Sequence, residues 1–155
     1  MYSNDLVCDI LDYIDSFLYT KITIEDLEYK FFYNRYYIMK LFKKEIGITI
    51  FDYINKLRIN NSINEINNTN NLLIKIAINN GFYSLEYFSE MFKKEIGISP
   101  REYKKSITNK YNYNDKITLA TANIIKINKT INFASRYKQN RKREILPIKK
   151  LSIFN

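Results

Sequence analysis

Apolar residues recur at steps of three and four along most of the first 106 residues, which is the spacing of one face of an α-helix. In the first such segment the apolar positions are Leu6, Ile10, Tyr13, Ile14 and Phe17. Helix-capping residues and terminal glycines bound the later segments. The pattern predicts seven helices, over residues 5–18, 24–31, 35–45, 50–66, 72–79 and 85–95 and from Ser99-Pro100 onward. The expected fold class is therefore all-α.

Two segments that lie 50 residues apart nearly repeat one another. LFKKEIGI at 41–48 and MFKKEIGI at 91–98 agree at seven of eight positions. The same shift superposes Phe32 on Phe82, Tyr33 on Tyr83, Tyr37 on Tyr87 and Tyr53 on Tyr103. Each copy joins a short helix to a longer one through a tight turn, the plan of a helix-turn-helix, whose second helix enters the DNA major groove. The helix over 50–66 is expected to link the two copies.

The turn of the second copy has favourable residues, and the turn of the first does not. Ala77 is the only alanine in the first 119 residues, and its small side chain suits the crossing of two helices. Gly81 supplies the positive φ that such a turn needs. In the first copy Leu27 and Phe31 occupy these positions. We therefore expect the first turn to follow a different backbone path or to be strained.

The net charge of +9 is confined to the C-terminal third of the chain. Residues 1–106 hold 14 Lys+Arg and 14 Asp+Glu, whereas residues 107–155 hold 11 and 2. The sequence predicts two regions, a neutral body over 1–106 and a basic C-terminal extension over 107–155. A solvated tail and a polyanion-binding segment are both open interpretations of this charge.

Within the extension, a helix is predicted over about 116–139, and residues 146–154 are expected to form either a short strand or an ordered extension. The apolar residues of the helix step by three and four, as in a seam that packs on another helix. They are Ile117, Ala120, Ile124, Ile127, Ile131 and Ala134. The seam suggests either packing within the chain or a homodimer through the C-terminal helix. It also provides an alternative function, a helical protein-interaction adaptor.

Several functional classes are disfavoured by composition. A lone Cys8 and the absence of histidine exclude a disulfide framework, a Cys/His zinc site and a histidine-based catalytic triad. We therefore expect no enzyme activity, no cofactor and no metal. The N-terminus lacks a basic signal-peptide region, and no apolar run approaches 18 residues. A cytoplasmic, nucleoid-associated protein is expected.

One stretch carries a family resemblance. Residues 74–105, IKIAINNGFYSLEYFSEMFKKEIGISPREYKK, show IA, GF, YF, FK, G and SP followed by Y. Residues 52–63, DYINKLRINNSI, resemble a central linker helix with an Arg-Ile pair. Residues 5–105 as a whole resemble the DNA-binding domain of the AraC/XylS family of bacterial transcription regulators. The resemblance implies two helix-turn-helix motifs, double-stranded promoter DNA as the partner, and RNA polymerase as a further candidate.

The candidate DNA-binding residues of the first copy follow from which face of its second helix is buried. If the core-facing residues are Tyr37, Ile38, Leu41 and Phe42, the outward residues are Arg35, Tyr36, Met39, Lys40 and Lys43, with Asn34 as the cap. A guanidinium near the helix start can bond guanine bidentately, and lysines neutralise phosphates. Arg35 is therefore the residue expected to recognise a base.

In the second copy the candidates are Ser84, Leu85, Glu86, Ser89, Glu90 and Lys93. Carboxylates at Glu86 and Glu90 repel phosphates and accept hydrogen bonds only from base amino groups. Base recognition is therefore expected mainly from the first copy. On the linker helix, Arg58 is expected either to contact phosphate or to tie the two halves together.

Overall fold

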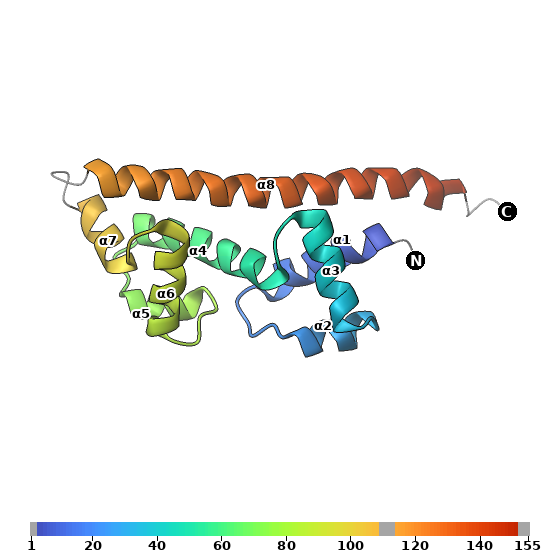
Figure 1. Ribbon diagram of the computed structural model, residues 1–155, viewed down its shortest axis with the longest axis horizontal. Helices are drawn as coiled ribbons and strands as arrows, with labels where there is room; N and C mark the ends of the chain where they lie inside the picture. The colour runs from blue at the N-terminus through green and yellow to red at the C-terminus, as the bar shows by residue number, and fades with distance from the viewer. Residues whose placement is uncertain (1–2, 109–113, 152–155) are drawn as a thin grey trace. The chain divides into compact units, whose positions relative to one another are not determined.

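The computed structural model describes residues 3–108 and 114–151 (Figure 1). All elements within these residues are α-helices, which confirms the all-α expectation. They are α1 (Ser3–Phe17), α2 (Ile24–Phe31), α3 (Arg35–Ile46), α4 (Ile50–Asn68), α5 (Leu73–Asn79), α6 (Leu85–Ile96), α7 (Pro100–Thr108) and α8 (Asn114–Leu151). Through α6, each helix begins and ends within two residues of its predicted bounds.

The helices form two compact units. Unit 1 contains α1, α2, α3 and the part of α8 from Thr130 onward. Unit 2 contains the connecting segment Leu18–Lys21, α4 from Phe51 onward, α5, α6, α7 and the part of α8 up to Lys129. The predicted C-terminal extension thus contributes helix to both units, and each unit contains one helix-turn-helix.

The core of unit 1 is built from the apolar faces of α1, α2 and α3. The side chains that are at most 1 % exposed include Leu6, Val7, Ile10, Ile14, Leu27, Ile38 and Phe42. Burial of each such side chain stabilises the fold by about 1.5 to 3 kcal/mol. Helix α2 begins at a capping box, in which Thr23 Oγ1 accepts a hydrogen bond from the Asp26 amide at 3.2 Å and Asp26 accepts one from the Thr23 amide at 2.7 Å. The apolar periodicity and the cap together fix the helix that precedes the first turn.

The core of unit 2 is built in the same way from α4, α5 and α6. Fully buried side chains include Ile59, Ile76, Ala77, Phe88, Phe92 and Ile96. Gly81 has φ 79°, and a Cβ there would lie 3.0 Å from both the Leu18 carbonyl oxygen and the Tyr19 Cα. The turn therefore needs glycine for two reasons. The positive φ was expected from the sequence, and the lack of space for a Cβ is shown by the structure.

The first turn follows a different path, as expected, but its left-handed residue is Phe32 and not Phe31. Phe32 has φ 58° and ψ 32° and closes α2 through its amide, which donates to the Glu28 carbonyl at 2.9 Å. Helix α2 runs two residues further in the repeat than α5, and each residue turns the chain by about 100°. As a result Phe32 is 89 % exposed whereas Phe82 is 3 % exposed. The two residues are aligned by the repeat in sequence but lie in different environments in the fold.

Helix α7 begins as predicted at Ser99-Pro100. Ser99 and Glu102 form a capping box, in which the Glu102 carboxylate accepts hydrogen bonds from the Ser99 amide at 2.9 Å and hydroxyl at 2.8 Å. These hydrogen bonds favour the ionised form and lower the pKa of Glu102 to about 2. The start of the helix is thus stabilised by an anion at its positive end.

Helix α8 is longer than the predicted 116–139, and it includes residues 146–151. The predicted strand is therefore wrong over 146–151, and residues 152–154 lie outside the described part of the chain. A short apolar run does not distinguish strand from helix by periodicity, and a strand needs a pairing partner. The described residues contain no strand with which residues 146–151 could pair.

Half of the residues of the predicted seam of α8 are buried inside the chain. Ala120, Ile127 and Ala134 are each 1 % exposed. In unit 2, the Asn123 side chain donates a hydrogen bond to the Ile96 carbonyl at 3.0 Å. In unit 1, the Tyr137 hydroxyl donates to the Glu45 carboxylate at 3.2 Å. Three of the six seam residues are thus buried within the chain, whereas Ile117 is 37 % exposed and Ile124 and Ile131 are half-buried.

Candidate nucleic-acid interface

Helix α3 is positioned by caps at both of its ends. Asn34 Oδ1 accepts a hydrogen bond from the Tyr36 amide at 2.9 Å. Gly47, at φ 89°, ends the helix, and its amide donates to the Lys43 carbonyl at 2.9 Å. The inward face buries Ile38, Leu41, Phe42 and Ile46. The opposite face is therefore fixed toward the outside of unit 1.

Four of the predicted residues lie on that outward face. Tyr36 is 73 % exposed, Met39 is 38 % exposed, and Lys40 and Lys43 are exposed. Neither lysine has a carboxylate partner among the side chains that the structure describes. Tyr37 does not face the core as expected, since it is 42 % exposed and stacks on Tyr33 with ring centroids 5.3 Å apart. The face thus combines aromatic, apolar and cationic groups.

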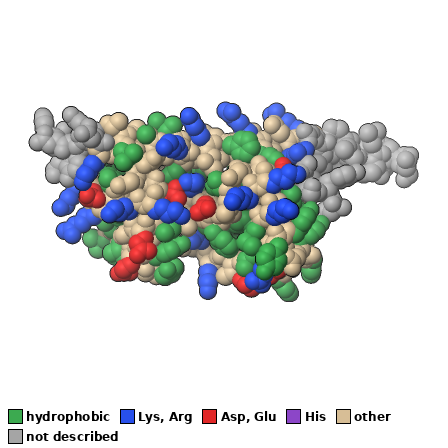
Figure 2. All heavy atoms as spheres, in the orientation of Figure 1, with side chains coloured by type: hydrophobic (Ala, Val, Ile, Leu, Met, Phe, Trp, Pro, Cys, Tyr) green, Lys and Arg blue, Asp and Glu red, His purple; other side chains and the backbone are tan. Residues whose placement is uncertain are grey.

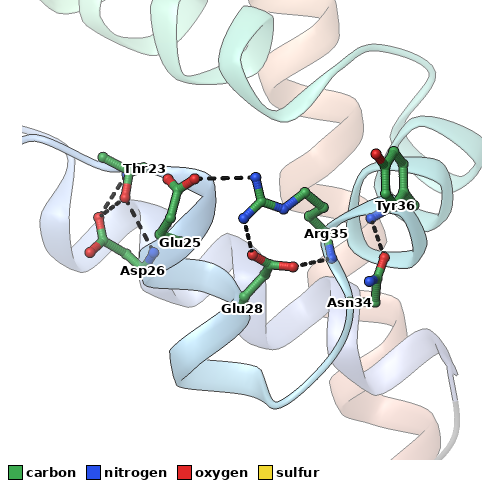
Figure 3. A network of polar contacts seen from close by, with 7 residues as sticks. All are labelled: Thr23, Glu25, Asp26, Glu28, Asn34, Arg35 and Tyr36. Atoms are coloured by element: carbon green, nitrogen blue, oxygen red, sulfur yellow. Dashed lines mark hydrogen bonds and ion pairs between the residues drawn. The ribbon is translucent and has the colours of Figure 1, made fainter.

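Arg35 lies beside this face but is held by carboxylates of α2 (Figure 3). Its Nη2 donates to Glu28 Oε2 at 2.6 Å, and its Nη1 lies 3.3 Å from Glu25 Oε1. The Arg35 amide also donates to Glu28 Oε1 at 2.7 Å. Glu28 therefore joins α2 to the first residue of α3 through two hydrogen bonds.

The charge state of this cluster is fixed by the contacts. The hydrogen bond from the Arg35 side chain, followed by that from its amide, lowers the pKa of Glu28. The same contact with Glu28 raises the pKa of Arg35. Both groups are ionised at neutral pH, and the guanidinium is engaged within the protein. Bidentate contact with guanine requires that this ion pair be exchanged for the base.

Helix α6 is capped at both ends like α3, but the residues on its exposed face differ. Ser84 Oγ accepts a hydrogen bond from the Tyr87 amide at 3.1 Å, and Gly97 ends the helix at φ 93°. Among the predicted residues, the exposed ones are Glu86, Glu90 and Lys93, and the half-buried ones are Ser84, Leu85 and Ser89. The Ser89 hydroxyl donates to the Leu85 carbonyl at 2.7 Å. The second face therefore carries two carboxylates and one cation.

Arg58 is buried in unit 2 and is 8 % exposed. Its Nε donates to the Leu18 carbonyl at 2.8 Å and its Nη2 to the Thr20 carbonyl at 2.7 Å. The guanidinium also lies over the Phe82 ring, 6.0 Å from the centroid. Burial lowers the pKa of Arg58 from its usual value. The expected phosphate contact is inconsistent with this burial, which removes Arg58 from the candidate interface and gives it a structural role.

Sequence reasoning missed the group that holds the second turn. The Glu65 carboxylate of α4 accepts hydrogen bonds from the side-chain amides of Asn71 at 2.9 Å, Asn79 at 2.8 Å and Asn80 at 2.8 Å. The spacing of these residues along the chain follows no helix or strand period. The abundance of asparagine in the chain also hides the three that matter.

The sequence analysis also did not include two stacked tyrosine pairs among the candidate DNA-binding residues. Tyr33 and Tyr37 stack in the first copy, and Tyr83 and Tyr87 stack in the second, with ring centroids 4.7 Å apart. Tyr83 is 81 % exposed. The 50-residue repeat superposes the two pairs and was the signal that could have identified them.

The described helices include none with the length and apolar character that a bilayer span requires. Within the same residues, no cluster of three or more His, Cys, Asp or Glu side chains is suited to a metal ion. The arrangement that remains is a pair of helix-turn-helix motifs, α2–α3 and α5–α6, each with a capped second helix whose outer face is exposed. This arrangement defines the class of double helix-turn-helix DNA-binding domains.

Comparison with known proteins gives the family. A family model described as a helix-turn-helix domain matches residues 29–106, just over half the chain. The HTH-type transcriptional activator AarP of Providencia stuartii is 30 % identical over 118 residues, which cover 76 % of this chain and 85 % of AarP. The chain belongs to the AraC/XylS family of DNA-binding transcriptional regulators.

Solved structures agree with this assignment. The C-terminal domain of the two-component response regulator yesN from Fusobacterium nucleatum superposes with a TM-score of 0.59 at 28 % identity, covering 61 % of this chain and 93 % of that domain. The DNA-binding domain of AdpA, solved with a target DNA, has a TM-score of 0.60 at 16 % identity and covers 64 % of this chain and 90 % of that one. The second likeness concerns the fold alone.

Proposed function

We propose that this protein regulates transcription by sequence-specific binding to double-stranded promoter DNA, with α3 as the main recognition helix. The supporting observation is the outward face of α3, where Lys40 and Lys43 are exposed and have no carboxylate partner among the described side chains. A capped helix that presents cations beside exposed aromatic and apolar groups suits a major groove lined by phosphates.

The proposal gives each residue of the first copy a role. Lys40 and Lys43 contact phosphates, while Tyr36 and Met39 meet base edges, where an apolar group fits the methyl of thymine. Asn34 caps the helix. Arg35 is a positioning residue that orients α3 through Glu28, in place of the base-recognition role expected from the sequence.

Helix α6 has the smaller part in this proposal. Lys93 is exposed and is assigned a phosphate, while Ser84, Leu85 and Ser89 are half-buried residues nearer the start of the helix. Glu86 and Glu90 are also exposed, and they limit close approach to the backbone of DNA. They accept hydrogen bonds from cytosine or adenine amino groups at best. The second copy therefore contributes to holding DNA near the protein more than to selecting its sequence.

Selection of bound sequences from a random duplex pool tests this proposal. We expect enrichment of a defined motif, and we expect Tyr36→Ala with Met39→Ala to change preference within it. The control is Tyr29→Ala with Lys30→Ala, which alters exposed residues of α2 and should leave the motif unchanged. A pool that stays random after repeated rounds, with folded protein, would contradict the proposal.

The proposal also includes contact with a protein partner. For RNA polymerase, the supporting surface is the pair of exposed rings Tyr29 and Phe32, 84 % and 89 % exposed. Exposed aromatic groups of this kind are enriched at protein interfaces. Tyr29→Ser with Phe32→Ser should then lower transcription from a selected promoter while leaving DNA affinity unchanged. Equal losses of both would contradict a polymerase contact there.

A homodimer through α8 has less support, because Ala120, Ile127 and Ala134 of the seam are already buried within the chain. The same burial leaves only the more exposed seam residues, such as Ile117, for the adaptor alternative. Sedimentation velocity of the full chain tests the homodimer, which predicts a dimer that Ile124→Asp with Ile127→Asp converts to monomer. A wild-type monomer would contradict it.

We further propose that the protein acts in the cytoplasm at the nucleoid and has no catalytic activity. DNA binding by α3 requires access to the chromosome. A fluorescent fusion should co-localise with DNA stain, and Lys40→Ala with Lys43→Ala should disperse it. An unchanged distribution of the variant would contradict this placement.

A further inference from the structure

Helix α8 carries an unusual charge pattern that the two helix-turn-helix motifs do not use. Residues 116–143 contain eight Lys and Arg and no Asp or Glu. Figure 2 shows Lys and Arg side chains recurring along this helix. The positive charge is therefore concentrated on one element.

Within unit 1, four described cations of α8 form two groups, and a fifth, Arg141, lies over the Tyr137 ring. The first group faces α1 and is paired. Lys138 Nζ lies 3.0 Å from Asp12 and 2.5 Å from Asp15, and Lys142 Nζ lies 3.0 Å from Asp12. Burial alone would raise the pKa of Asp12, but the hydrogen bonds from the two lysines leave it lowered. These two lysines hold the helix to unit 1.

The second group lies on a stripe that we call the outer stripe, with residues at steps of three, four and three. Its members are Phe133, Arg136, Asn140 and Arg143, and all four are exposed. Neither Arg136 nor Arg143 has a carboxylate partner among the side chains described over 6–108 and 116–143. The stripe is thus a face with uncompensated positive charge.

We propose that the outer stripe is a second contact surface for the phosphates of DNA, separate from the recognition helices. Arg136 and Arg143 are seven residues apart, about 10.5 Å along the helix axis, so their guanidinium groups reach different phosphates. The Asn140 amide lies between them on the same stripe and can donate to a phosphate oxygen. This inference rests on the proposed function, because DNA is the polyanion that the recognition helices bring to the protein.

The composition of the stripe favours a nucleic acid over a membrane surface. A helix that lies in a bilayer interface needs a broad apolar face. On α8 between Thr130 and Arg143, the only exposed large apolar side chain described is Phe133, 51 % exposed. The apolar seam residue Ala134 is buried. The contact surface is therefore electrostatic and independent of base sequence.

The test compares two variants that remove the same charge from opposite faces of α8. Arg136→Gln with Arg143→Gln removes the outer stripe, and Lys138→Gln with Lys142→Gln removes the paired lysines. Affinity for the selected duplex and for a scrambled duplex is titrated between 50 and 300 mM salt by fluorescence anisotropy. Circular dichroism confirms that each variant is folded.

The outer-stripe variant should lower the slope of log K against log salt by about 1.8, or about 0.9 for each lost phosphate contact. At 0.1 M salt this corresponds to a loss of up to about 60-fold, equal for the two duplexes. The paired-lysine variant should keep the wild-type slope and lose thermal stability instead. Arg136→Lys with Arg143→Lys should restore most of the slope.

Four results would overturn the proposal. An unchanged slope for the outer-stripe variant, with site-specific binding by the wild type, overturns this inference alone. Equal slope losses in the two double variants would show a general charge effect and also overturn it. Binding to phosphatidylserine vesicles that the outer-stripe variant loses, with an unchanged DNA slope, would assign the stripe to a membrane surface. A wild type that binds no duplex would refute the proposed function as well.

Discussion

The two helix-turn-helix motifs share a buried framework but stabilise their turns by different means. In the first copy, the turn contains a left-handed Phe32 and an ion pair between Glu28 and Arg35, both within the motif. In the second copy, the turn relies on Gly81 and on the Glu65 carboxylate of α4, which lies outside the motif. The first turn is thus self-contained, whereas the second depends on the linker helix.

The outward faces differ more than the inward faces. Phe42 and Phe92 are equivalent in the repeat and are both fully buried. On the exposed side, Lys40 is replaced by Glu90 and Tyr36 by Glu86. Packing restricts the buried positions, while the solvent-facing positions are free to change charge. The comparison teaches that similarity of framework does not imply an equal role in DNA binding.

The largest expected effect on stability comes from removing Arg58, the buried arginine of unit 2. Arg58→Ala leaves the carbonyls of Leu18 and Thr20 without their donors and should lower the free energy of unfolding by about 3 kcal/mol or more. Urea denaturation followed by circular dichroism measures this loss. The control Arg101→Ala, an exposed arginine of α7, should change stability by less than about 0.5 kcal/mol. Equal effects of the two substitutions would show that Arg58 is not structural.

The second largest expected effect concerns Gly81 of the second turn, for which Gly47 at the end of α3 is the control. Gly81→Ala adds a Cβ at 3.0 Å from backbone atoms and should cost about 2 to 3 kcal/mol. Gly47→Ala, at φ 89° with no atom within 4 Å of the added Cβ, should cost only the conformational strain of about 1 kcal/mol. Denaturant titrations of both variants provide the comparison. Equal losses would mean that backbone strain alone explains Gly81.

The ion pair of the first turn separates positioning from base recognition. If Arg35 positions α3, both Arg35→Ala and Glu28→Gln should lower stability slightly and weaken binding to all duplexes alike. Anisotropy titrations with the selected site and its single-base variants measure this. If Arg35 instead recognises guanine, Glu28→Gln should tighten binding, and Arg35→Ala should relax preference at one or two positions.

The smallest expected effect concerns the cap of α7 in unit 2. The pKa of Glu102 is lowered from 4.5 to about 2, so its ionised form is favoured in the folded state. Its contribution to stability is complete above pH 4.5 and is lost as the pH falls toward about 2. An NMR titration of the side-chain carboxyl should show the low midpoint, and Ser99→Ala should raise it. A wild-type midpoint near 4.5 would contradict the capping box.

The fold followed from local signals in the sequence, because helix periodicity, caps and terminal glycines act over a few residues. Thr23, Asn34 and Ser84 cap the helices directly before the predicted starts at residues 24, 35 and 85. The site was less predictable, because its decisive contacts join distant residues. Arg58 meets a loop 38 to 40 residues away, and Glu65 meets three asparagines of no regular spacing. The ion pair of Arg35 with Glu28 depends on the path of the first turn. The sequence did not determine that path, because Phe31 occupies the position of Gly81.

The most direct test of the unequal roles is the salt dependence of binding to a selected duplex for two double variants. Lys40→Ala with Lys43→Ala should weaken binding and lower the slope of log K against log salt by about 1.8. Glu86→Ala with Glu90→Ala should leave affinity unchanged or tighten it, since exposed carboxylates near phosphates are removed. If the glutamate variant loses site preference while the lysine variant binds like the wild type, the second copy is the main recognition element and the assignment to α3 is wrong.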